Sequence, residues 1–159
     1  MLQRIQTVFL LLAVVAISLT FILPLRTILF DGVPKGYYTN YGITFLETTG
    51  AAFKTISGFV YIAAAAVLLV LLFTISQFKR RKFQLLLCKL LFVLLIIQIA
   101  LNIFLPGLDV QKIKLAKEIT LGNYEAGFFM PTIAIVCVFI AQWRIKKDEE
   151  LVKSADRLR

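Results

Sequence analysis

The stretch KRRK, at residues 79–82, lies between two long apolar stretches of the chain. A cluster of lysine and arginine this dense on a short connection is retained on the cytoplasmic side of a membrane, because such loops are not readily translocated. It therefore predicts a cytoplasmic turn at residues 77–82, and this assignment sets the side of every other segment. The residues that determine the topology are Lys79, Arg80, Arg81 and Lys82.

Composition supports a membrane environment. Of the 159 residues, 60% are hydrophobic, whereas soluble domains are about 45–50% apolar. The formal net charge is +9, which in a soluble chain would suggest nucleic acid. Here we expect the cations to flank membrane spans and to meet anionic lipid headgroups at the cytoplasmic face. The expected partners are membrane lipid and integral membrane proteins, and not nucleic acid.

About 20 apolar residues suffice to cross the hydrocarbon layer, and four stretches meet this criterion. The predicted fold is an all-α membrane protein, an antiparallel bundle of four transmembrane helices in a single integral membrane domain over residues 1–159. Both termini are expected in the cytoplasm, since the inner segments hold 12 of the 18 lysines and arginines. The predicted spans are residues 5–25, 55–76, 83–105 and 126–143, with external loops at 26–54 and 106–125 and a cytoplasmic tail at 144–159.

The two external loops carry strand-like patterns. The first contains YYTNYGITF after a Gly/Pro turn, which favours a short β-ribbon on the outer membrane face. Alternatively, its tyrosines form an interfacial belt at the headgroups. The second loop fits either a strand added to that ribbon or a short helix.

Two prolines and the tail give signals about where helices end. Pro106, followed by Gly107, is expected to end the third span. Pro131 marks either a kink in the fourth span or its start. The tail RIKKDEELVKSADRLR is weakly amphipathic, and we expect the fourth helix to continue through it into the cytoplasm.

Small residues give the second span a surface on which another helix could pack closely, because packing drives helix association in lipid. Two interpretations are open: a docking face for a partner protein, or packing against the chain's own helices. The residues concerned are Gly58, Ala63, Ala64, Ala65 and Ala66.

The third span carries polar residues at membrane depth. Lys89 is a candidate functional ion, or else it reaches the inner headgroups by extending its charged end toward water. Gln98 and Asn102 are four residues apart and share a helix face. Such amides usually hydrogen-bond to a neighbouring helix, and they could instead line a polar pocket.

The sequence lacks the usual residues of catalysis. It has no histidine, the commonest general base and metal ligand. Cys88 and Cys137 lie inside apolar stretches outside any CxxC motif, and we expect both to be inert packing residues. Nothing has metal-ligand spacing, and no glycine-rich phosphate loop is present. We therefore expect no enzyme, no cofactor, no metal and no catalytic residue.

Several segments together resemble a known family. MLQRIQTVFLLLA at residues 1–13, GFFMPTIAIV at 127–136 and the ending RIKKDEELVKSADRLR are similar to a family of small Bacteroidota inner-membrane proteins classed as a domain of unknown function. The resemblance covers essentially the whole chain. It implies a bacterial plasma membrane location, and it brings no activity, substrate or catalytic residue.

These patterns favour an interaction role. The leading hypothesis is a non-catalytic accessory or structural subunit of a larger bacterial inner-membrane complex, with protein translocation, envelope biogenesis or respiratory assembly as the candidate processes. The alternative is a small transporter or a lipid- or ligand-binding membrane protein. A transporter usually carries ionisable residues near the midplane or broken helices in corresponding halves.

Overall fold

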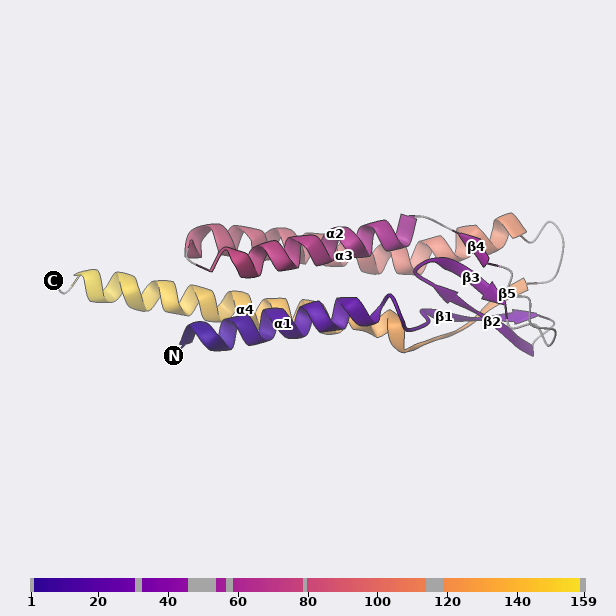
Figure 1. Ribbon diagram of the computed structural model, residues 1–159, viewed down its shortest axis with the longest axis horizontal. Helices are drawn as coiled ribbons and strands as arrows, with labels where there is room; N and C mark the ends of the chain where they lie inside the picture. The colour runs from indigo at the N-terminus through magenta and orange to yellow at the C-terminus, as the bar shows by residue number, and fades with distance from the viewer. Residues whose placement is uncertain are drawn as a thin grey trace.

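The computed structural model describes residues 2–30, 33–45, 54–56, 59–78, 80–113 and 119–157 (Figure 1). In these segments the chain forms four helices and five strands. The helices are α1 (Leu2–Leu19), α2 (Phe59–Ser76), α3 (Arg81–Ile113) and α4 (Ala126–Arg157). The strands are β1 (Arg26–Phe30), β2 (Val33–Thr39), β3 (Gly42–Phe45), β4 (Lys54–Ile56) and β5 (Ile119–Tyr124).

The helices pack side by side, each against two others: α1 on α2 and α4, and α3 on the same two. Their shared core consists of small and branched apolar side chains, including Ala13, Ala134 and Ala141, which let the backbones approach closely. Figure 1 shows that α1 begins, and α4 ends, at the end of the molecule away from the strands.

The strands form one antiparallel sheet at the other end of the molecule, in the order β4-β3-β2-β1-β5 (Figure 1). Side chains alternate between its two faces because successive residues of a strand point in opposite directions. Ile28, Tyr38 and Ile43 are buried and pack with Val60 of α2 and Val110 of α3 in a second core. This core joins the sheet to the helices.

The prediction of an all-α protein is wrong, because the external loops form this five-stranded sheet. The ribbon expected in the first loop is present as β1 to β3, whereas β4 was not predicted and begins at the last residue of that loop. In the second loop the strand alternative is the one found, since β5 pairs with β1. A two-residue turn at Asn40 and Tyr41 joins β2 to β3, and it is followed by Gly42, whose φ of 122° few other residues adopt.

The prediction of a four-span bundle is also wrong. Among the described residues, two helices are long and apolar enough to cross a membrane, Lys82–Gln111 of α3 and Ala126–Leu151 of α4. The apolar parts of α1 and α2 are shorter, Gln6–Leu19 and Val60–Ser76.

The first two uncharged stretches are longer than the helices that they contain, so they do not correspond to membrane spans. The stretch at residues 5–25 ends in turns from Thr20 onward, and Leu25 belongs to the core beneath the sheet. At the start of the stretch at 55–76, Thr55 and Ile56 belong to β4. An 18-residue helix is about 27 Å long, against a hydrocarbon layer of about 30 Å.

Pro106 does not end the third helix, as the sequence predicted. It is buried inside α3, which continues to Ile113. The extension is stabilised by its contacts with the sheet, because Val110 packs in the second core. Pro131 likewise lies inside α4, which begins at Ala126 and continues to Arg157, so the predicted extension of the fourth helix through the tail is confirmed.

Candidate functional site

The turn between α2 and α3, which carries the lysine and arginine cluster and is called the basic turn below, lies at the end of the molecule opposite the sheet (Figure 1). Arg80 and Lys82 are exposed to solvent, and α3 begins at Arg81. The Arg80 amide donates to the Gln77 carbonyl at 3.0 Å, which tightens the turn. Lys79 lies outside the described residues. These cations share their end of the molecule with the start of α1 and the last turns of α4 (Figure 1).

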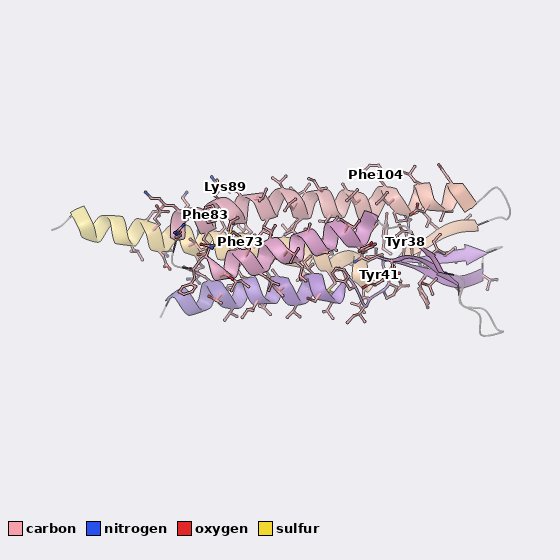
Figure 2. The ribbon with its side chains drawn as sticks, turned by 45° about the horizontal axis from the view of Figure 1, so that its top comes forward. Tyr38, Tyr41, Phe73, Phe83, Lys89 and Phe104 are labelled. Atoms are coloured by element: carbon pink, nitrogen blue, oxygen red, sulfur yellow. The ribbon has the colours of Figure 1, made fainter. Side chains whose placement is uncertain are left out.

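Lys89 lies on the outer surface of α3 and not in the interior of the bundle. Its side chain is exposed, and Figure 2 shows it pointing away from the other helices. Phe83 packs edge-on against Phe73 of α2, with ring centroids 6.3 Å apart. A lysine in this position is free to extend its ammonium group toward the basic end.

Gln98 and Asn102 are buried in α3, with exposed fractions of 0% and 1%. The Gln98 amide nitrogen donates to the Asn102 side-chain oxygen at 3.5 Å. Among the described residues, Gln98 Oε1 and Asn102 Nδ2 have no hydrogen-bond partner. Exchanging O and N in both amides reverses the bond and still leaves one acceptor and one donor unused. The pair could therefore bind one small group that both donates and accepts a hydrogen bond.

The alanines of α2 are distributed around the helix. Ala64 is buried, Ala63 and Ala65 are half-buried, and Ala66 is exposed. Gly58 lies outside the described residues. The buried alanine lies on the side of α2 that contributes Val67 and Leu71 to the core.

The junction between sheet and helices contains buried polar contacts that sequence reasoning missed. The Tyr38 hydroxyl donates to Asp109 Oδ2 at 2.9 Å, and both residues are buried. The Asn40 amide donates to the Thr20 carbonyl at 2.9 Å and contacts the Thr20 hydroxyl at 3.0 Å. Figure 2 shows Tyr38 between α3 and the strands. The only sequence signal was an acidic residue shortly after Pro106, where the helix was expected to have ended.

A matching contact joins the first and last helices at the opposite end. The Gln6 amide donates to Asp148 Oδ2, and both side chains are 7% exposed. Near the basic turn, the Gln84 amide lies 3.4 Å from the Thr74 carbonyl and joins α3 to α2. These polar side chains connect helices, so they act as structural contacts in the core.

Aromatic and cationic side chains pair just before α4 and within its second half. Before its start, the Arg26 guanidinium lies 4.3 Å from the centre of the Tyr124 ring and donates through Nε to the Gly122 carbonyl. In its second half, Trp143 has Arg144 at 5.2 Å and Lys147 at 5.4 Å from its ring centre. Distances of this size are within the range of cation–π attraction.

The described residues contain no group of three or more histidine, cysteine, aspartate or glutamate side chains that could hold a metal ion. Cys88 and Cys137 are both buried and unpaired, on α3 and α4, and both belong to the core between the helices.

Comparison with known proteins identifies the family of the chain. No curated protein and no solved structure matches it. One family model matches residues 2–158. That match covers nearly every residue, so the chain belongs to the family described as Domain of unknown function (DUF4293).

Proposed function

We propose that this chain is a multi-pass protein of the bacterial inner membrane, in which α3 and α4 cross the bilayer and α1 and α2 pack against them, with the start of α3 and the last turns of α4 on the cytoplasmic side. Support comes from the distribution of charge. Arg80, Lys82, Lys146 and Lys147 are exposed at the end where the cytoplasm is expected. A bacterial membrane is what the resemblance to the Bacteroidota family implies.

The outward-facing surface of the helices agrees with lipid contact. The exposed side chains between the two ends of the bundle are large and apolar, in a pattern that lipid tails tolerate and water does not. Examples are Leu69, Leu86, Val93, Phe104, Val136 and Phe139. Tyr41 stacks on Tyr61 and contacts Phe21 near the sheet, and Trp143 lies near the other end. Tyrosine and tryptophan are enriched at both membrane interfaces.

Within that membrane, we propose a non-catalytic accessory role, in which the sheet presents a partner-binding face outside the bilayer. The observation that carries this proposal is the rigid connection of the sheet to α3. The helix extends past Pro106 and holds the sheet through the buried Tyr38–Asp109 hydrogen bond. Because the sheet cannot rotate freely, its orientation relative to the membrane is fixed.

The sheet face turned away from the helices has a defined chemistry. Tyr37 is 39% exposed and lies between Thr27 and Thr44 of the neighbouring strands. Thr120 of β5 is exposed on the same face. The hydroxyls of Thr27, Tyr37, Thr44 and Thr120 suit a polar protein surface, so the expected partner is an integral membrane protein with its own external part.

Copurification tests the proposal. The chain is extracted at native abundance in mild detergent, and the accompanying proteins are identified by mass spectrometry. Tyr37→Arg should remove the partner, because it replaces a hydroxyl-bearing ring at the contact with an unpaired charge. Gln111→Arg, at an exposed position on α3, is the matched control. Recovery of this chain alone, or equal loss with both variants, would refute the accessory role.

One observation favours a second candidate, a ligand-binding membrane protein. The unused oxygen of Gln98 and the unused NH of Asn102 lie in the bundle interior. A small neutral molecule that bears a hydroxyl or amide would satisfy both. Native mass spectrometry of the purified chain would reveal such a ligand as a mass that Gln98→Leu removes.

A further inference from the structure

The surface that carries a further inference is the cationic aromatic patch on α4, formed by Trp143, Arg144 and Lys147. The tryptophan is 51% exposed, and two cations lie near its ring, Arg144 at 5.2 Å and Lys147 at 5.4 Å from the ring centre. The three positions fall within about 100° of the helix circumference at 3.6 residues per turn. Lys146 lies on the opposite side of Trp143 from Arg144, and it has no place in the patch.

The Arg144 guanidinium has unused donor capacity. Arg144 is half-buried, and its Nε is buried without a hydrogen-bond partner among the described residues. Because the side chain is only half-buried, its exposed part can meet an acceptor from outside the chain. Arginine presents its donors in a planar fork that fits two oxygens of a phosphate.

The position of the patch along α4, relative to the thickness of a membrane, indicates which molecule would supply those oxygens. Trp143 lies about 26 Å along α4 from Ala126 at 1.5 Å per residue, close to the thickness of the hydrocarbon layer. The acidic residues of the next turn are Asp148, which is buried against Gln6, and Glu149 and Glu150, which lie farther toward the cytoplasm. The patch therefore lies at headgroup level, where lipid phosphates are the abundant acceptors.

We propose that Trp143, Arg144 and Lys147 form a binding site for the phosphate of an anionic phospholipid in the cytoplasmic leaflet. Arg144 binds the phosphate oxygens, Lys147 adds a second positive charge, and the Trp143 ring packs against the glycerol region of the lipid. The inference rests on the membrane placement proposed above and adds a lipid class and its ligands.

The chain contains one tryptophan, so its fluorescence reports on this patch alone. The full chain is reconstituted in phosphatidylcholine vesicles that contain a small fraction of brominated phosphatidylglycerol, which quenches tryptophan on contact. A parallel sample contains the same fraction of brominated phosphatidylcholine. We expect a preference for phosphatidylglycerol of up to about 25-fold in the quenching, with each of the two cations contributing about fivefold.

Variants assign the preference to the patch. Arg144→Gln combined with Lys147→Gln should lower quenching by phosphatidylglycerol to the level of phosphatidylcholine, whereas Lys146→Gln should leave it unchanged. Lys147→Gln alone changes an exposed side chain outside the core, and it should reduce the preference about fivefold. Excess inorganic phosphate should not relieve the quenching, because the site is occupied from the bilayer.

The outcomes separate this proposal from the membrane placement. Equal quenching by both brominated lipids would refute the lipid site and leave the placement intact, and no quenching by either lipid would refute both. Loss of the preference in Lys146→Gln to the same degree would show diffuse attraction and overturn the site. Relief by inorganic phosphate would identify a site for free phosphate and overturn the lipid assignment.

Discussion

Replacing Gly127 with alanine should disrupt the start of α4, where the helix lies close to the backbone of residues 23 and 24. A Cβ atom at Gly127 would lie 2.5 Å from the Pro24 carbonyl oxygen and 2.7 Å from the Leu23 carbonyl oxygen. Both are backbone atoms, so neither can rotate away. The Gly127 amide also donates to the Pro24 oxygen at 2.9 Å, which fixes α4 to the segment that leads into β1.

The magnitude follows from two effects. Overpacking a tight contact destabilises a protein by about 1–3 kcal/mol, and weakening the adjoining hydrogen bond adds about 1 kcal/mol. The matched control is Gly107→Ala in α3, where a Cβ would meet nothing within 4 Å. In a helix interior alanine is favoured over glycine by about 0.8–1.0 kcal/mol, so this control should stabilise the chain.

Thermal unfolding in detergent, followed by circular dichroism, compares the two variants. One kcal/mol shifts the midpoint by about 2–4 °C for a chain of this length. Gly127→Ala should therefore lower the midpoint by roughly 5–15 °C, and Gly107→Ala should raise it by about 2–4 °C. If Gly127→Ala had the same unfolding midpoint as the unsubstituted chain, the close approach of α4 to residues 23 and 24 would be refuted.

Three further predictions concern buried polar groups and thiols. Tyr38→Phe removes the hydroxyl that donates to Asp109 and should destabilise the chain by about 1–3 kcal/mol, measured by thermal unfolding. Gln98→Leu alone leaves Asn102 buried without its partner and should destabilise by about 1–3 kcal/mol, whereas leucine at both positions should be nearly neutral by the same measurement. A larger loss in the double variant would instead indicate a bound ligand. The two buried cysteines should resist a water-soluble maleimide until denaturant is added, and mass spectrometry would count the labels.

Much of the sheet was predictable because its signals are local. The β-branched and aromatic run YYTNYGITF, after a Gly/Pro turn, predicts strand structure from neighbouring residues alone, although the turn at Asn40 and Tyr41 that divides it into β2 and β3 was not predicted. The extension of α4 through the tail was also predictable, since its helical pattern continues without a break past Trp143. In both cases the information lies within a few turns or strand lengths of sequence.

The number of spans and the end of α3 were not predictable in this way. An uncharged run shows only that its residues avoid water, and Leu25 does so beneath a sheet rather than inside a helix. Pro106 removes a local hydrogen bond from α3, yet packing of Val110 against strands distant in sequence keeps the helix intact. Such tertiary contacts override the local signal, and composition does not reveal them.

The same distinction between local sequence and tertiary contacts applies to the candidate site residues. The cations of the basic turn could be inferred from the order of residues. By contrast, the unused atoms of Gln98 and Asn102 depend on which neighbours the helix places beside them. The sequence indicated that the two amides share a face, and it gave no reason to expect their hydrogen bond to be within the helix rather than across it.

The buried polar pairs explain how these helices keep one alignment. Apolar faces surrounded by lipid discriminate poorly between one packing register and the next, because lipid tails are as apolar as leucine. Gln6 pairs with Asp148, 142 positions away, and Tyr38 pairs with Asp109, 71 positions away, at opposite ends of the molecule. If α4 slipped by one turn along α1, Gln6 and Asp148 would both lose their partner in an apolar interior. The free-energy penalty of that loss, at each end independently, selects the observed register and thereby fixes where the sheet and the basic end lie.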